Sequence, residues 1–450
     1  MSSLLKEIGN VMQYARLQAE NSEAANLILN EEQAGTGEFG PSESNIFYLG
    51  DNIRFLKTLA ANDEYRGKIQ MIYIDPPFFT KSDYEAVLSA GGRKLRHPAY
   101  QDTWKKGLYE YLRNLAARLL LMKELLREDG LIFVHLDWHA SHYVKIIMDE
   151  IFGEDQFVNE LIWTYKSGGS TKKHFSRKHD TILMYSKTKK YVFYPQKEKS
   201  YNRGMKPYRF HGVKEYEDEH GWYTLVNMKD VWSIDMVGRT SSERTGYASQ
   251  KPEQLIERMM RSATKKGDLT ADFFSGSGTL PAVASRLGRR FIACDIGNLA
   301  ASYTMKRVQE NGAGMSLYAD QPFQVMTEES NPPFRIRVDC ETEQQILPEE
   351  KLLKIIISDF FDLRFGKDIK DTDRIQAREL ASENPLALLD SWSLDPHFDG
   401  HVFRPAAQFI RRNGKLQYSY QNVFRNPGRM VIKAQDIFGR SIAMEIFEKK

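Results

Sequence analysis

The chain has 450 residues, of which 41% are hydrophobic, and its 63 lysines and arginines against 60 aspartates and glutamates give a formal net charge of +3. At roughly 100–200 residues per domain, this length predicts about two to four domains and excludes a peptide, a disordered tail or a single small module. Because the whole chain is nearly neutral, any surface that binds a polyanion must be a local excess of positive charge.

Cysteine usage and hydropathy indicate the compartment. Two cysteines, Cys294 and Cys340, are too few for a disulfide framework and stand in no metal-ligand spacing. The longest dense apolar run, residues 352–357, is far shorter than the roughly 18 residues of a membrane span. The first residues lack the basic, apolar and small-residue order of an export signal. We expect a soluble cytoplasmic protein that binds no membrane and no metal.

The N-terminal third predicts an arm followed by an α/β block. Helical spacing of apolar residues up to residue 30 and a Gly- and Glu-rich stretch after it indicate a peripheral arm and linker over residues 1–44. In residues 45–155 short apolar runs alternate with longer periodic segments. The pattern predicts strands at 46–49, 69–74 and 131–136 and helices at 53–60 and 109–127. Strands separated by helices are typical of a parallel sheet with helices on both faces.

The same alternation returns in residues 251–330. Helices are expected at 252–263 and 280–287, and strands at 269–274 and 290–294. Residues 156–250 interrupt it with aromatic and charged sequence of low periodicity, which we interpret as an insert. One mixed, mostly parallel sheet is expected to use both blocks, giving a Rossmann-like α/β fold.

The C-terminal part is predicted to be a linker and a small β domain. Residues 331–384 form the linker, with a helix at 349–361. Residues 385–450 form a β-sandwich. Asn413-Gly414 is a hairpin signal between strands at 408–411 and 415–420, and Phe438-Gly439 turns the strand 431–437 into 442–447.

A glycine-rich turn is the first candidate site. Asp272-Phe-Phe-Ser-Gly276-Ser-Gly278-Thr279 follows a predicted strand, and glycines two apart let the backbone approach a ligand at the sheet edge. Pro281 replaces the third small residue of a dinucleotide fingerprint, and a carboxylate at the strand end favours a cationic or amine-bearing ligand over a pyrophosphate. Asp295, which ends the next strand, suits ribose hydroxyls. A tight turn without a ligand is the alternative.

Asp75-Pro-Pro-Phe78 is the second candidate site. It follows a buried apolar strand, and its prolines hold the Asp75 carboxylate and the Pro76 carbonyl rigidly at the sheet edge. Two rigid acceptors beside the Phe78 ring form a pocket for a planar ring that carries an amine. The similar Asn331-Pro-Pro-Phe334 follows no such strand, so we expect an ordinary loop there.

Together the two segments resemble the motifs of the DNA amino-methyltransferases that use S-adenosylmethionine, in the permuted group where Asp-Pro-Pro-Phe precedes Phe-x-Gly-x-Gly. Further matching segments occur in one consistent order at residues 49–52, 134–138, 178–185 and 245–252. The resemblance implies transfer of a methyl group to the N6 amine of adenine in double-stranded DNA. It also implies an inserted target-recognition region and an appended C-terminal β-sandwich.

The resemblance also implies roles for single residues. The target pocket would consist of Asp75, Pro76, Pro77 and Phe78. Cofactor-binding residues would be Asp51 near the adenine, Asp295 at the ribose, Gln250, Lys251 and Pro252 closing the methionine side, and Asp272, Phe274, Gly276, Gly278 and Thr279 around the methionine end. Phe79-Thr80 and Ala248-Ser249 depart from the Asn-Thr and Pro-Thr that many relatives carry, and these changes concern the shape of the pocket more than the activity.

The chemistry of this reaction sets two further expectations. The lone pair of an adenine amine is delocalised into the ring, so the pocket must bind that nitrogen by hydrogen bonds and align it with the methyl donor. We expect Asp75 to stabilise the developing ammonium charge, with later proton loss to water, rather than to act as a general base. Since the amine is paired in duplex DNA, the base must be flipped out of the helix.

Positive charge is concentrated in the insert, where residues 160–215 hold 14 lysines and arginines against four acidic residues. Such a cluster can give salt-dependent affinity for phosphates, although a solvated surface is the alternative. The expected DNA-binding residues are Lys166, Lys172, Lys173, Arg177, Lys178, Arg203, Lys206 and Arg209.

Other features have simpler interpretations. His135, Asp137 and His139 alternate at a strand end, where we expect packing rather than a metal site. Met259, Met260, Met305 and Cys294 are expected in the core.

Two alternative functions remain open. Cytosine N4 methylation is the closest, because relatives with that activity more often carry Ser where this chain has Asp75. A catalytically silent DNA-binding subunit is the other. The sequence also leaves open a homodimer and a role as a subunit of a restriction or defence system.

Overall fold

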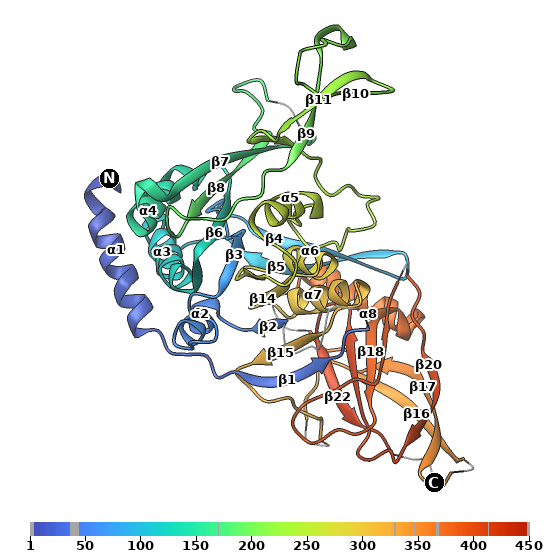
Figure 1. Ribbon diagram of the computed structural model, residues 1–450. Helices are drawn as coiled ribbons and strands as arrows, with labels where there is room; N and C mark the ends of the chain where they lie inside the picture. Colours follow the sequence, from blue (N-terminus) through green and yellow to red (C-terminus); the bar gives the residue numbers. More distant parts are fainter. Residues whose placement is uncertain are drawn as a thin grey trace.

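The computed structural model describes residues 4–36, 45–169, 171–327, 330–345, 347–365, 369–412 and 414–447. A mixed sheet of ten strands crosses the molecule in the order β1-β15-β2-β14-β13-β3-β6-β8-β7-β12 (Figure 1). The strands are β1 Ile28–Gln33, β2 Ile46–Leu49, β3 Ile69–Ile74, β6 Leu126–Leu136, β7 Phe157–Thr164, β8 His179–Ser186, β12 Val231–Ser233, β13 Leu269–Asp272, β14 Arg290–Asp295 and β15 Met315–Ala319. The six strands from β15 to β6 run parallel, as the alternation of strands and helices predicts.

Helices cover both faces of this sheet and bury opposite sides of the same strands. Ile72 and Ile132 belong to the core under α1, α2, α3 and α4, whereas Met71 and Phe133 belong to the core under α5 and α6. The alternation follows from the two-residue period of a strand. The helices are α1 Leu4–Asn21, α2 Asn52–Ala60, α3 Leu108–Leu125, α4 Ser141–Phe152, α5 Glu253–Ala263, α6 Thr279–Leu287 and α7 Asn298–Glu310.

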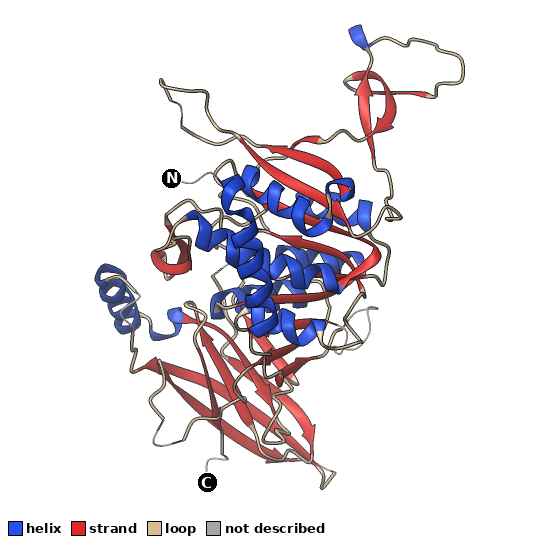
Figure 2. Ribbon diagram, turned by 90° about the vertical axis from the view of Figure 1, so that its left-hand side faces the viewer, coloured by secondary structure: helices blue, strands red, loops and turns tan. Residues whose placement is uncertain are grey.

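The region expected as an insert is partly built into the sheet. β7, β8 and β12 extend it beyond β6, because the apolar run 181–186 is buried in β8 and pairs antiparallel with β6. The interpretation of residues 156–250 as a separate insert was therefore wrong for these strands. What projects from the body is the loop between β7 and β8 and a three-stranded sheet of β9 Lys197–Tyr201, β10 Glu215–Asp218 and β11 Gly221–Asn227 (Figures 1 and 2).

The N-terminal arm is also more integrated than expected. Val11 and Ala15 of α1 are fully buried, and β1, which covers the end of the expected helical arm and the start of the linker, pairs antiparallel with β15 at the edge of the main sheet. Residues 37–44 of that linker lie outside the described residues.

The C-terminal part contains two antiparallel sheets on a common core. One consists of β16 Arg335–Gln344, β17 Glu350–Phe361 and β20 Ser419–Arg425; the other consists of β18 Leu389–Asp395, β19 Ala407–Ile410, β21 Val431–Asp436 and β22 Ser441–Glu445. The helix α8 Asp371–Glu383 lies between them in sequence. The expected turn at Phe438-Gly439 is confirmed, since β21 pairs antiparallel with β22.

Two predictions in this part were wrong. The helix expected at 349–361 is strand β17, because alternate residues such as Leu353, Ile355 and Ile357 are buried while it pairs with β16 and β20. The C-terminal sheets consequently begin at Arg335 rather than at residue 385. The strands expected to pair around residue 413 lie in different sheets, β19 beside β18 and β20 beside β17, and a single antiparallel bridge between Arg412 and Lys415 joins the two sides of the turn. Asn413 itself lies outside the described residues.

A long β-hairpin packs beside the sheet at residues where no strand was expected. It consists of β4 Asp83–Ala90 and β5 Arg93–Gln101, joined by Gly91 and Gly92, both with positive φ. None of the helices in the described ranges has the length and apolar character to cross a bilayer.

Candidate active site

The two predicted motifs meet at the carboxyl edge of the main sheet. β3 and β13 pair in parallel, Met71 with Thr270 and Ile72 with Ala271. Because parallel strands end at the same edge, the segments that follow them open into one cavity of about 570 Å³. The fold thus brings together residues that are about two hundred positions apart in the chain.

Most of the expected site residues line this cavity. Gly278 and Pro252 do not reach it, since they are the N-cap residues of α6 and α5 behind its wall. The expected residues in the wall are Asp51, Asp75, Pro76, Pro77, Phe78, Gln250, Lys251, Asp272, Phe274, Gly276, Thr279 and Asp295.

The turn between β13 and α6 requires its two glycines. Gly276 has φ +50° and Gly278 has φ +73°, and a Cβ atom on Gly278 would lie 2.5 Å from Oγ1 of Thr304 in α7. Asp295 holds the turn from the next strand end: its Oδ2 accepts the Gly276 amide at 2.8 Å and its Oδ1 accepts the Gly297 amide at 2.9 Å. The Asp295 carboxylate therefore organises the turn as well as lining the cavity.

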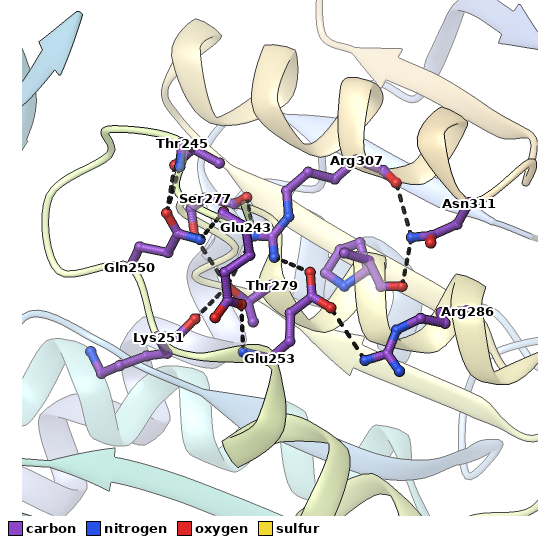
Figure 3. Close-up of polar contacts among 12 residues, drawn as sticks. Glu243, Thr245, Gln250, Lys251, Glu253, Ser277, Thr279, Arg286, Arg307 and Asn311 are labelled. Carbon is purple, nitrogen blue, oxygen red and sulfur yellow. Dashed lines mark hydrogen bonds and ion pairs between the residues drawn. The ribbon is translucent and has the colours of Figure 1, made fainter. Parts of the chain in front are cut away.

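An ion pair behind the turn connects it to α5 (Figure 3). The buried guanidinium of Arg307 donates to the Ser277 carbonyl at 3.0 Å and pairs with Glu253 at 2.6 Å. The Thr279 hydroxyl donates to the Lys251 carbonyl at 3.2 Å. These contacts fix the glycine turn relative to the segment that carries Lys251.

Gln250 uses its side chain within its own loop. Its Oε1 accepts from the amide and hydroxyl of Thr245 at 2.8 and 2.9 Å, and its Nε2 donates to the Glu243 carbonyl at 2.6 Å (Figure 3). In this arrangement the Gln250 side chain shapes residues 243–251, and the residue also lines the cavity.

The cavity has an acidic floor. Burial raises the pKa of Asp272 well above the usual range of an aspartate, against a hydrogen bond from the Phe274 amide, and the nearby carboxylates of Asp75 and Asp295 raise it further. Burial also raises the pKa of Asp295, while hydrogen bonds from the amides of Gly297, Gly276 and Ile296 lower it. Converging carboxylates of this kind favour a cationic ligand.

Asp75 has two different carboxylate oxygens. Oδ2 forms an ion pair and hydrogen bond with Nζ of Lys251, whereas the buried Oδ1 has no hydrogen-bond partner among the described residues. The same ammonium lies 5.1 Å from the centre of the Phe78 ring. Lys251, expected on the cofactor side, therefore contacts the residues assigned to the target pocket.

Asp102 is a site residue that sequence reasoning missed. Its carboxylate accepts the amides of Phe79 and Thr80 at 2.9 and 2.7 Å and the Thr80 hydroxyl at 2.7 Å. Phe79 has φ +64°, so Asp102 stabilises a strained turn directly after Phe78. No local motif marks Asp102, because its role depends on the position of the β4–β5 hairpin.

The hairpin itself forms one wall of the cavity through residues 98–101. The Tyr100 hydroxyl lies 2.9 Å from Oγ of Ser249, and the Val87 amide donates to the Gly246 carbonyl at 2.9 Å. Alternating apolar residues on both sides of Gly91-Gly92 were the available signal for it.

Arg118 of α3 is another missed residue. It lines the cavity, donates to Oδ1 of Asn52 at 2.5 Å and pairs with Asp51 at 3.2 Å. Asp51 also caps α2 by accepting the Ile53 amide. This places a buried cation beside the acid that was expected near the cofactor adenine.

His135 lies in a buried polar network behind Phe78. One ring nitrogen is 2.9 Å from the Tyr73 hydroxyl and the other 3.2 Å from Asp180, and the ring stacks on Phe78 with centroids 5.9 Å apart. His139 pairs instead with Asp137. In the described part of the chain no three His, Cys, Asp or Glu side chains converge as they would around a metal ion.

The expected DNA-binding cations lie on two projecting segments. Lys166, Lys172, Lys173, Arg177 and Lys178 are on the loop between β7 and β8, whose first residue, Tyr165, hydrogen-bonds Asp180 at 3.0 Å. Arg203, Lys206 and Arg209 are exposed between β9 and β10. Two of these cationic side chains contact the protein itself: Lys178 donates to the carbonyls of Ser167 and Gly168, and Arg177 stacks on Trp138 at 3.8 Å.

The remaining predictions concern packing. Met259, Met260, Met305 and Cys294 are buried in the core, as expected. Asn331-Pro-Pro-Phe334 is a loop before β16, as expected, and its Phe334 ring stacks on Phe360 at 4.6 Å in the C-terminal core.

A family model described as DNA methylase matches residues 69–306. The match extends from β3 to α7 and covers more than half of the chain. The chain belongs to this family. The match includes both motifs that line the cavity, which makes the cavity the candidate active site of this DNA methylase.

Curated proteins similar to this methylase include type II methyltransferases. M.EcaI of Enterobacter cloacae is 29% identical over 63% of this chain and 74% of its own length, and M2.DpnII of Streptococcus pneumoniae is 27% identical over 59% and 89%. The DNA adenine methyltransferase YhdJ of Escherichia coli is 23% identical over 60% and 84%. Among solved structures, M1.HpyAVI in complex with S-adenosylmethionine has a TM-score of 0.40 at 16% identity, over 58% of this chain and 98% of that one.

Proposed function

We propose that this DNA methylase transfers a methyl group from S-adenosylmethionine to the N6 amine of adenine in double-stranded DNA. The observation that carries the proposal is the single cavity in which the Asp75 carboxylate and the Phe78 ring lie beside the Gly276 turn. Names of similar proteins agree with it, since they include type II methyltransferases and a DNA adenine methyltransferase.

The residues of the cofactor side fit S-adenosylmethionine. That molecule carries a positive sulfonium and an amino group, and the cavity offers the carboxylates of Asp272 and Asp295. Ser275 supplies a buried hydroxyl without a hydrogen-bond partner among the described residues. Gly276 leaves the backbone free of a side chain at the cavity wall. We assign Asp295 to the ribose of the cofactor, and Asp51 and Arg118 to its far end, where the adenine would lie.

The target side supplies positioning and charge stabilisation. The cofactor supplies an electrophilic methyl group on sulfur. Asp75 Oδ1 is a rigid, buried acceptor for a hydrogen of the target amine, and the Phe78 ring offers a stacking face for the base. Binding holds the amine in line with the methyl donor, so the translational and rotational entropy of the reactants is lost on binding rather than in the chemical step. This positioning accounts for most of the rate acceleration. The Asp75 charge stabilises the ammonium that develops on the amine.

DNA must approach from the edge where these residues open. An amine paired inside a duplex cannot reach Asp75, so the adenine is flipped out and stacks on Phe78, which offsets the unstacking cost of roughly a few kcal/mol. The exposed cations on the two projecting segments supply phosphate contacts. The loop between β7 and β8 starts at the Tyr165–Asp180 contact behind Phe78, which connects DNA binding to the target pocket.

Cytosine N4 methylation and a silent DNA-binding subunit remain the alternatives. Mass spectrometry of nucleosides from unmethylated DNA, after incubation with the protein and S-adenosylmethionine, separates all three. We expect N6-methyladenine, its loss with Asp75→Ala, and full activity with Asn331→Ala in the similar loop segment. Finding only N4-methylcytosine would contradict the adenine assignment, and finding neither product would favour the silent subunit.

The biological setting follows from this activity. We propose that the enzyme works on DNA in the cytoplasm as part of a restriction or defence system, in line with its similarity to type II methyltransferases and to Mod subunits of type III restriction enzymes. Sequencing of modified bases in a host that expresses the protein would identify the recognition site. Size-exclusion chromatography with light scattering would test a homodimer.

A further inference from the structure

The contact between Lys251 and Asp75 has no part in the roles expected from the sequence. Lys251 was expected at the methionine end of the cofactor, yet its ammonium pairs with Oδ2 of Asp75. Both side chains are largely buried, with 8% and 18% of their surfaces exposed. A buried ion pair at the target residue affects the reaction directly, because each partner fixes the position and charge of the other.

The pairing distinguishes the two oxygens of Asp75. Oδ2 accepts the hydrogen bond from Lys251, and Oδ1 is buried in the cavity wall without a partner among the described residues. A lysine ammonium is a point donor, so it can hold one carboxylate oxygen and leave the other available. An arginine fork would engage both oxygens.

Lys251 is itself held from several sides. Its Nζ donates to the Ser249 carbonyl at 3.3 Å and lies 5.1 Å from the Phe78 ring centre, and its own carbonyl accepts from the Thr279 hydroxyl. Figure 3 shows the side chain extending away from the Arg307–Glu253 pair, which fixes the start of the helix that follows Lys251. The ammonium is therefore as rigidly placed as the carboxylate it contacts.

We infer that Lys251 is a positioning residue for methyl transfer, which orients Asp75 through Oδ2 so that Oδ1 faces the amine of the target base. The inference rests on the proposed function and deepens it. Held in this orientation, the Asp75 carboxylate accepts the amine hydrogen through Oδ1 and stabilises positive charge on the amine. It touches neither the methyl donor nor the base through a hydrogen bond of its own.

Single-turnover methylation on duplex DNA, with separate titrations of S-adenosylmethionine and DNA, tests this role. For Lys251→Met we expect a methyl-transfer rate constant about 100-fold lower, the loss that a misplacement of about 1 Å causes between reacting groups. The dissociation constants of both ligands should stay within about threefold of wild type, because the lost contact orients Asp75 rather than binding either ligand. Lys265→Met is the matched control, since that lysine also lies 5.1 Å from an aromatic ring, that of Tyr194, but outside the cavity.

A chemical rescue separates positioning from folding. Lys251→Cys should be as slow as Lys251→Met, and alkylation with 2-bromoethylamine, which rebuilds an ammonium side chain, should restore the rate to within about tenfold of wild type. The introduced thiol stands in the cavity wall, whereas both native cysteines are buried and do not line the cavity, so the introduced thiol is the one that reacts. Lys251→Arg should rescue poorly, because its fork takes both oxygens of Asp75.

Three outcomes would overturn the inference: a wild-type rate for Lys251→Met, a full rescue by arginine, or a loss explained entirely by weaker S-adenosylmethionine binding. The last would return Lys251 to the cofactor side. A wild-type protein that binds S-adenosylmethionine but leaves DNA unmethylated would instead contradict the proposed function.

Discussion

Replacing Gly278 by alanine tests whether the glycine turn is built as described. The residue has φ +73°, and an added Cβ atom would lie 2.5 Å from Oγ1 and 2.7 Å from Cα of Thr304 in α7. The second distance is to backbone, so a rotation of the Thr304 side chain cannot relieve the overlap. Either α7 or the turn has to move, and the Gly276 amide that binds Asp295 moves with the turn.

Two costs add in this variant. A left-handed backbone conformation costs a non-glycine residue about 1–2 kcal/mol, and overpacking a tight contact costs about 1–3 kcal/mol. We expect Gly278→Ala to lower the free energy of unfolding by about 2–5 kcal/mol. That is a large part of the roughly 5–15 kcal/mol by which a typical domain is stable.

Gly267→Ala isolates the first cost. Its φ is +86°, and a Cβ atom there would have no heavy atom within 4 Å. Denaturant unfolding of both variants, followed by fluorescence, should show a loss of only about 1–2 kcal/mol for Gly267→Ala. Isothermal titration should show weaker S-adenosylmethionine binding for Gly278→Ala alone. Equal destabilisation of the two variants would refute the close approach of the turn to α7.

The remaining predictions concern other parts of the molecule. Asp102→Ala should lower the rate constant of methyl transfer about 10-fold or more, because the amides of Phe79 and Thr80 lose their hydrogen-bond acceptor. DNA affinity should change little. An unchanged single-turnover rate would contradict this prediction. Burial raises the pKa of Asp436 to about 6, although Arg440 opposes the shift. The folded state then holds the proton of Asp436 more tightly than the unfolded state, so the protonated carboxyl contributes stability that is complete below about pH 4. This contribution is lost as the pH rises through about 6. In urea unfolding curves, the free energy of unfolding of Asp436→Asn should therefore rise by up to about 3 kcal/mol relative to wild type between about pH 4 and pH 7. A pH-independent difference would contradict the sign. Replacing Arg203, Lys206 and Arg209 with glutamine should reduce the slope of log K against log salt by about 3 in DNA-binding titrations, whereas Lys354→Gln on the C-terminal sheet should leave it unchanged.

Much of the catalytic fold could be predicted because its signals are local. The strands β3 and β6 are short apolar runs separated by an amphipathic helix, and that pattern allows few arrangements other than a parallel sheet. β17 shows the limit of such reasoning. The apolar pattern of residues 350–361 is compatible with a helix or a strand, and pairing with β16 and β20 selects the strand.

The residues of the candidate site also fall into those that local sequence predicts and those that only the fold brings to the cavity. Asp75 and Gly276 stand in sequence motifs whose chemistry is evident from a few neighbouring residues. Asp102 and Arg118 do not, because each becomes a site residue only when a distant element is placed against the cavity. Lys251 was located correctly at the cavity, but its contact with Asp75 depends on the course of residues 243–251, which the hydrogen bonds of Gln250 set.

The β4–β5 hairpin is fastened on its outer side to the C-terminal region. Arg93 pairs with Glu379 and Glu383 of α8 at 3.0 and 2.6 Å, the Arg96 amide donates to Asp373 at 2.8 Å, and the His97 ring packs on Phe438 with centroids 5.7 Å apart. The next four residues, 98–101, line the cavity. A shortened protein that ended before residue 331 would keep every catalytic motif and still lose the scaffold behind one side of its binding chamber. The appended sheets thus support one wall of the cavity from outside, although none of their described residues borders it.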